Sequence, residues 1–176
     1  MILFRHGDRR YPFFWEQPAQ PIGRWHGTDE GPVQYLADTS HGAWAEYLRH
    51  EEIVDEVDLA GVERAFWAIE VDVDDLKPAA LPYAVMTGDQ DTYEQCRSEA
   101  RHLRDDGSPG FTAPSAALVN DGATGHRVDG GIHDGPPRDG VNYILFGRWP
   151  EAVGWTVVDR GRPPVRLLPR VRHFST

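Results

Sequence analysis

The stretch GPVQYLADTSHGAWAEYLRHE, residues 31–51, combines two patterns that decide the fold class. Its first half, PVQYLAD, is a short apolar run that predicts a buried strand. Its second half carries Ala43, Ala45 and Leu48 with Trp44 and Tyr47 at helical spacing. With Ser40 as the expected N-cap, it predicts a helix directly after the strand. Strands mixed with a few helices, without regular βαβ alternation, indicate an α+β domain.

Other segments extend this pattern along the chain. Residues 90–106 are amphipathic and predict a helix, which Gly107 would end. The glycine-rich stretch 122–140 has no apolar periodicity and predicts a mobile loop. Further strand-like segments are ILFR, VERAFWAIEVDV, FTAPSAALVND and VNYILFG.

The composition describes a chain that folds by packing alone. It has 176 residues, the length of one ordinary domain, and its single cysteine, Cys96, excludes an internal disulfide framework and fits a reducing cytoplasm. No apolar run approaches the roughly 18 residues of a membrane-spanning helix, and the apolar N-terminus is too short for a signal peptide. We therefore expect one soluble, cytoplasmic domain over residues 1–176.

The charge disfavours nucleic acid as a direct partner. The formal net charge is −10, and acidic residues are concentrated in EEIVDEVDLAGVE and EVDVDDLK, whereas a nucleic-acid-binding protein normally presents a basic face. The stretch DRGRPPVRLLPRVRH near the C-terminus is basic instead. Residues 149–176 are expected to form an extension that packs on the domain or is partly flexible.

The histidines do not form a metal-binding pattern. There are eight, but the sequence contains no HExxH or HxH motif and no cysteine pair. We therefore expect no metal, and scattered surface positions for most of these side chains. The scattered histidines include His41, His50, His102, His126 and His133.

The stretch FRHGDRRYP resembles the RHGxRxP signature of histidine phosphatases. The resemblance would make His6 a nucleophile, with arginines holding the phosphate and GGIHDG supplying a downstream histidine–aspartate pair. Only three apolar residues precede the motif, however, and a loop rich in proline and aromatic residues follows it. The competing interpretation is a solvated histidine after an edge strand.

A longer series of motifs resembles a different family. In chain order the pieces are FR (4–5), GRW (23–25), GPVQYLAD (31–38), AWAEYLRH (43–50), DTYEQ (91–95), GFTAPSA (110–116) and GVNYILF (140–146). As an ordered set over residues 4–148, they resemble the RES domain, a bacterial family named for its arginine, glutamate and serine.

The resemblance implies an ADP-ribosyltransferase-like fold, with two small β-sheets flanked by helices and an NAD cleft between them. Members of the family degrade NAD by phosphorolysis or hydrolysis, and many are toxins paired with a helix-turn-helix (Xre-type) antitoxin. We therefore expect NAD as substrate, inorganic phosphate as a possible co-substrate, and such an antitoxin as a possible partner. One alternative is ADP-ribosyl transfer to a protein or small molecule at the same site, and another is a binding role without activity.

The same resemblance suggests roles for charged residues. Cleavage of the bond between nicotinamide and ribose passes through an oxocarbenium-like centre, which a nearby carboxylate stabilises. Glu46 is the candidate for this carboxylate. Arg24 and Arg5 are the candidates for binding the diphosphate, because guanidinium groups match phosphate oxygens with paired donors. Arg9 or Arg10 could replace Arg5 in this role.

Two uncharged residues complete the predicted site. Tyr35 could stack on nicotinamide or hold the ribose, or it could be an ordinary core tyrosine. Ser115 could donate a hydrogen bond to the substrate, or it could be a serine at a strand edge. Trp25 and Trp44 are expected to pack near the cleft as support.

Overall fold

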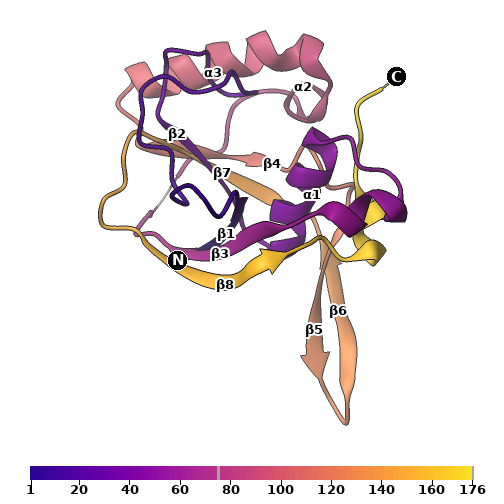
Figure 1. Ribbon diagram of the computed structural model, residues 1–176. Coiled ribbons are helices and arrows are strands. Elements are labelled where there is room, and N and C mark those ends of the chain that lie inside the picture. The colour runs from indigo at the N-terminus through magenta and orange to yellow at the C-terminus, as the bar shows by residue number, and fades with distance from the viewer. Residues whose placement is uncertain (75, 176) are drawn as a thin grey trace.

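The computed structural model describes residues 1–74 and 76–175 and has an α+β architecture (Figure 1). A six-stranded antiparallel sheet has the order β4-β7-β2-β1-β3-β8, and a two-stranded sheet consists of β5 and β6. The predicted fold class is thus confirmed.

The strands are β1 (Ile2–Gly7), β2 (Val33–Ala37), β3 (Arg64–Glu70), β4 (Gly110–Pro114), β5 (Ala123–Val128), β6 (Ile132–Arg138), β7 (Val141–Phe146) and β8 (Val153–Gly161). The helices are α1 (Ser40–His50), α2 (Tyr83–Thr87) and α3 (Tyr93–Asp105), with 3₁₀ turns η1 (Glu56–Gly61), η2 (Gln90–Thr92) and η3 (Val165–Arg170).

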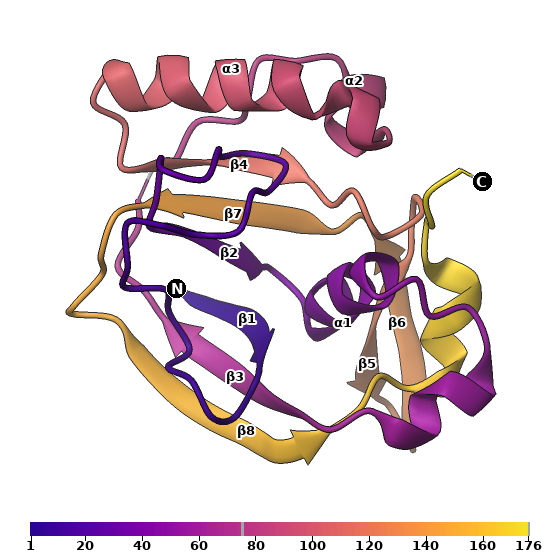
Figure 2. The same cartoon turned by 45° about the horizontal axis from the view of Figure 1, so that its top comes forward.

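The large sheet divides into two halves at the seam between β1 and β2. These strands share one facing pair, Phe4 and Ala37, whereas β1 and β3 face each other along their whole length. We call β4, β7 and β2 the β2 half-sheet, and β1, β3 and β8 the β3 half-sheet. Figure 2 shows the two halves inclined to each other, with α1 beside the seam.

Helix α1 begins one residue earlier than the sequence predicts. Thr39, not Ser40, is the N-cap: its backbone is extended and its Oγ1 accepts a hydrogen bond from the Gly42 amide at 3.0 Å. Ser40 already belongs to the helix. Ala43, Trp44 and Leu48 then turn inward and pack in a buried cluster with other apolar side chains.

Helix α3 covers one face of the β2 half-sheet (Figures 1 and 2). Cys96 and Ala100 from the helix pack against Phe111 of β4 and Ile144 of β7. The predicted helical range 90–106 contains η2 followed by α3, and Gly107 has a φ of 79°, the left-handed conformation that glycine favours at a helix end. Among the described residues, no helix is both long and apolar enough to cross a membrane.

The glycine-rich stretch predicted as a mobile loop is a β-hairpin instead. β5 and β6 pair from Ala123 opposite Arg138 to Val128 opposite Ile132, and the hairpin projects from the body of the protein (Figure 1). Both of its faces are largely exposed, so alternating apolar residues are not required. This exposure explains why apolar periodicity did not reveal the strands.

The last part of the chain contributes to the same body. β8 pairs with β3 as an edge strand of the large sheet, and Leu167 of η3 is fully buried beside α1. The residues after η3 run back toward α1 and α2. The strand predicted over FTAPSAALVND is shorter than expected and ends at Pro114.

Candidate active site

Glu46 of α1 is held by two side chains from distant parts of the sequence. Its Oε1 accepts a hydrogen bond from Ser115 Oγ at 2.9 Å and another from Asn142 Nδ2 at 2.7 Å. Both donors bind the same oxygen, which leaves Oε2 as the oxygen that can face a ligand. The carboxylate is therefore fixed in direction before any ligand arrives.

Ser115 lies just past the end of β4, where the chain turns sharply. Its Oγ accepts hydrogen bonds from the Leu118 amide at 3.2 Å and the Ala117 amide at 3.3 Å. Because the hydroxyl accepts from the backbone, its own proton is directed to Glu46. Ser115 is 3% exposed, so it positions the glutamate from within the protein.

Asn142 of β7 was not among the predicted site residues. It faces Ala37 on one side and Ala113 on the other, and these small side chains leave room for its amide beside Glu46. Its Oδ1 is buried and has no hydrogen-bond partner among the described residues. The sequence could have indicated Asn142, because it is a polar residue within the apolar strand VNYILF and a buried amide requires hydrogen-bond partners.

Arg24 reaches from the GRW loop to the turn that follows α2. Its Nη2 donates to the Gly88 carbonyl at 2.7 Å, and its Nη1 donates to Thr92 Oγ1 at 3.4 Å. The guanidinium lies over the Tyr93 ring, 4.4 Å from its centroid. Arg24 thus has a defined position beside α2 and α3.

Arg49 is a second arginine at the same turn, and the sequence analysis missed it. Its Nη2 donates to the Gly88 carbonyl at 2.8 Å, and its Nη1 donates to the Ala116 carbonyl, next to Ser115. Burial, and secondarily the charge of Arg24, lowers the pKa of Arg49. The sequence could have indicated Arg49, because it lies three residues after Glu46 on α1 and residues at that spacing share a helix face.

Tyr35 positions the loop that carries Arg24. Its hydroxyl accepts a hydrogen bond from the Trp25 amide at 3.0 Å and lies 2.8 Å from His26 Nδ1. Since His26 Nε2 donates to the Pro21 carbonyl at 2.9 Å, Nδ1 is the nitrogen that accepts the Tyr35 proton. Burial raises the pKa of Tyr35 and lowers that of His26, so both groups stay neutral near pH 7.

Arg5 does not join Arg24 in this structure. It lies in the seam, where its Nη1 donates to Gln34 Oε1 at 3.3 Å, and desolvation there lowers its pKa to about 10. Arg9 and Arg10 lie at the surface, paired with Asp159 and Asp8. The structure therefore brings Glu46, Ser115 and Arg24 into one region with Arg49, and leaves these other arginines elsewhere.

The phosphatase constellation is not assembled. His6 packs between the rings of Trp44 and Tyr47, whereas His133 lies exposed on the projecting hairpin and binds the Asp129 carbonyl. In the described part of the chain, no group of three or more histidine, cysteine, aspartate or glutamate side chains is arranged to hold a metal ion.

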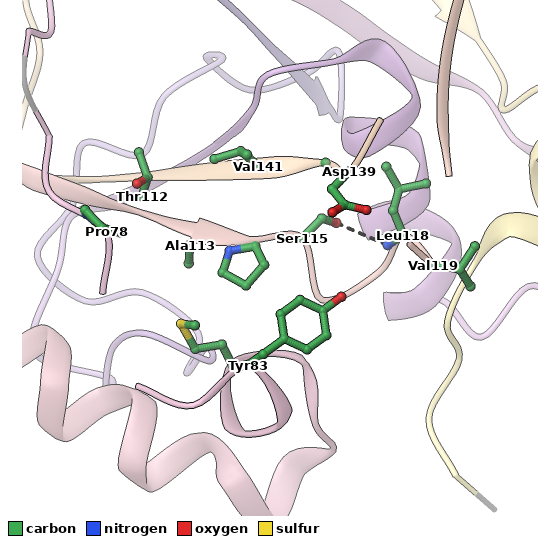
Figure 3. A pocket seen from close by; sticks show the side chains of 12 residues that line it. Pro78, Tyr83, Thr112, Ala113, Ser115, Leu118, Val119, Asp139 and Val141 are labelled. Atoms are coloured by element: carbon green, nitrogen blue, oxygen red, sulfur yellow. Dashed lines mark hydrogen bonds between the residues drawn. The ribbon is translucent and has the colours of Figure 1, made fainter. Parts of the chain in front are cut away.

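A groove of about 380 Å³ lies between α2 and the strands β4 and β7 and adjoins the site through Ser115 (Figure 3). Tyr83 of α2 lies on one side of the groove, and Ala113 of β4 and Val141 of β7 lie on the other. Ser115 lines this groove and also donates a hydrogen bond to Glu46. The remaining lining residues are Pro78, Met86, Thr112, Pro114, Leu118, Val119, Asp139 and Gly140.

The fold and the site define an α+β domain with one oriented carboxylate and two neighbouring buried arginines. The family model of the RES domain matches residues 2–166, so the chain belongs to the RES domain family. Membership supports an NAD-related, toxin-like function and an NAD-acting enzyme at the level of the family. A comparison with curated proteins found no match.

Proposed function

We propose that the protein cleaves NAD at the bond between nicotinamide and ribose, by phosphorolysis or hydrolysis. The observation that carries the proposal is the oriented carboxylate of Glu46, whose Oε1 is bound by Ser115 and Asn142. Family membership supports NAD as the substrate, and the arginines beside the carboxylate suit a dinucleotide.

Glu46 would stabilise the reacting carbon. When the bond between C1′ and the nicotinamide nitrogen breaks, both bonding electrons leave with the nitrogen, which becomes neutral, and positive charge develops on the ribose. A carboxylate already fixed in place stabilises this charge without having to reorganise. An oxygen of water or phosphate then bonds to C1′ and loses its proton to solvent.

Arg24 would bind the diphosphate and so hold the ribose beside Glu46. A guanidinium offers paired donors to phosphate oxygens, and stacking on Tyr93 restricts its orientation. Tyr35 would act through this loop, because its hydroxyl is already bonded to Trp25 and His26. Transfer of ADP-ribose to another acceptor would use the same residues with a different nucleophile.

The experiment is incubation of the purified protein with NAD, with and without inorganic phosphate, followed by chromatography of nicotinamide and the ribose product. Nicotinamide release supports the proposal, and a phosphorylated ribose product identifies phosphorolysis. Labelled NAD added to a cell extract tests transfer, because label would then appear on macromolecules. Absence of nicotinamide release under all three conditions would contradict the proposal.

A toxin role with a helix-turn-helix antitoxin is part of the same proposal. Expression in a bacterial host would then slow growth and lower cellular NAD, and co-expression of the antitoxin would restore both. Unchanged NAD during expression would argue against this role.

A further inference from the structure

Arg24 and Arg49 come from opposite ends of the site and converge on one atom. Each donates a hydrogen bond to the Gly88 carbonyl oxygen, at 2.7 Å and 2.8 Å. The two side chains are almost fully buried, with residue exposures of 9% and 3%. Two buried cations next to each other repel, and a neutral carbonyl compensates little of their charge, so this arrangement favours binding of an anion.

Arg49 also retains unused binding capacity. Its Nε is buried and has no hydrogen-bond partner in the residues that the structure describes. A guanidinium that binds phosphate commonly does so through two adjacent N–H groups, and Nε is one of the groups available for this. This unpartnered donor is independent of the convergence on Gly88 and points to a missing acceptor.

The turn at Gly88 is shaped to bring the two arginines together. A Cβ at this position would lie 2.7 Å from Thr92 Cγ2 and 2.8 Å from the Ala84 carbonyl. Both distances are too short for real contacts, so glycine permits the close turn that presents the carbonyl. Any larger residue would displace the atom that both guanidinium groups share.

Two groups cover Arg49 in this structure. The carboxylate of Asp89 forms a long ion pair with Arg49, with Oδ1 at 3.5 Å from Nη2, and the Phe174 ring lies 4.4 Å from the guanidinium carbon. The Ser175 amide donates to the other carboxylate oxygen, Asp89 Oδ2, at 3.2 Å. An internal carboxylate thus lies beside the arginine pair, at a distance that leaves the pairing incomplete.

We propose that Arg49 and Arg24 together bind the diphosphate of the nucleotide, and that Asp89 acts as an internal anion which the diphosphate displaces. This inference deepens the proposed function and rests on it for the identity of the ligand. It adds Arg49 as a binding residue and makes Asp89 a competitor, with Phe174 moving away from Arg49 together with the carboxylate.

The test is calorimetric titration of the full chain with ADP, and with adenosine as the ligand that lacks phosphate. Asp89→Asn removes the competitor, and Asp91→Asn, an exposed neighbour, removes the same charge without touching Arg49. We expect Asp89→Asn to bind ADP at least about threefold more tightly than Asp91→Asn, in line with the loss of one weakly paired carboxylate. Adenosine binding should be equal in the two variants.

A second variant tests the arginine directly. Arg49→Lys keeps the charge but loses the paired donors, so ADP affinity should fall by about tenfold or more. If this variant does not fold, as judged by circular dichroism, the comparison of Asp89→Asn with Asp91→Asn decides alone. Equal ADP affinity of those two variants, or no ADP binding by the unmodified chain, would overturn the inference.

The ADP-binding experiment tests the arginine pair separately from the NAD-cleavage experiment that tests the proposed function. ADP lacks the bond between nicotinamide and ribose, so its binding is measured whether or not the protein cleaves NAD. Nicotinamide release without the Asp89 effect would overturn only the arginine pair. ADP binding that shows the Asp89 effect, without nicotinamide release from NAD, would contradict the proposed reaction and support the anion site.

Discussion

The two half-sheets are both antiparallel, but the side chains that they direct toward α1 have different roles. In the β3 half-sheet, His6 and Phe66 fill the space beneath α1 by stacking against Trp44. In the β2 half-sheet, Ala37 and Ala113 flank Asn142 and leave room for polar contacts with Glu46. The difference indicates that bulky rings support the fold on one side, whereas small residues open space for chemistry on the other.

Helix α1 connects the two functions because it presents a different face to each half. Trp44 and Leu48 pack in the buried apolar cluster, whereas Glu46 and Arg49 make the polar contacts of the site. Apolar packing on the first face therefore fixes the orientation of the second. Substitutions on each face therefore affect stability and activity separately.

The largest expected effect is on stability, from the β3 half-sheet. Phe66 is 3% exposed and its ring lies 4.7 Å from that of Trp44, so Phe66→Ala should cost about 3–5 kcal/mol of unfolding free energy. Urea denaturation followed by fluorescence measures this. Under conditions where the variant is folded, KM for NAD should change little; a large rise in KM with unchanged stability would break the comparison.

Ser115→Ala should have its main effect on activity. The substitution removes one hydrogen bond to the Glu46 carboxylate, worth about 1.5–3 kcal/mol, so kcat/KM for nicotinamide release should fall about 10- to 100-fold. Ser98→Ala on the exposed side of α3 is the matched control and should retain full activity. Equal activities of the two variants would mean that Ser115 does not orient the glutamate.

The third prediction concerns acid stability. Burial, followed by the charges of Arg64, Arg5 and His50, lowers the pKa of His6 to about 3, so the folded protein keeps it neutral, whereas the unfolded chain protonates it near pH 6.5. The unfolded state thus binds more protons below pH 6.5, and stability is lost as the pH falls. His6 alone should account for about 2 kcal/mol between pH 7 and pH 5.

Urea midpoints of the unmodified chain and of His6→Gln at both pH values measure this contribution. His26, His41 and His173 have pKa values lowered by burial as well, but they titrate equally in both proteins. The difference between the two proteins therefore reports His6. The same loss of stability in both would contradict a neutral buried imidazole.

The smallest effect is expected on the projecting hairpin. Val128 and Ile132 are 81% and 77% exposed at its tip, so replacing both by serine should change the unfolding free energy by less than about 0.5 kcal/mol. Thermal denaturation and nicotinamide release should both match the unmodified chain. A marked loss of stability would show that the tip packs against the body.

The fold was predictable where burial imposes a period on the sequence. β2, α1 and α3 each bury one face or both, and their apolar residues recur accordingly. β5 and β6 were missed because both of their faces meet solvent. The cap of α1 was misplaced by one residue because Thr39 and Ser40 are both good N-caps, and only the backbone geometry distinguishes them.

The site was predictable only in part, for a related reason. The ordered motifs indicated Glu46, Arg24 and Ser115, which the structure places in one region. Asn142 lies 96 residues from Glu46 in sequence, and no local pattern reports a contact over that distance. Arg5 lies apart from Arg24, because its strand position does not reveal that the side chain enters the seam, and its role in binding NAD stays a prediction.

The most direct test of the account is nicotinamide release from NAD by Glu46→Gln, compared with Glu51→Gln. Glutamine keeps the shape of Glu46 and can accept both hydrogen bonds, so stability should be preserved while the negative charge is lost. We predict a fall in kcat of about 100- to 1000-fold for Glu46→Gln, and unchanged activity for the exposed Glu51→Gln. Full turnover by Glu46→Gln would contradict the central claim that this carboxylate stabilises the reacting ribose.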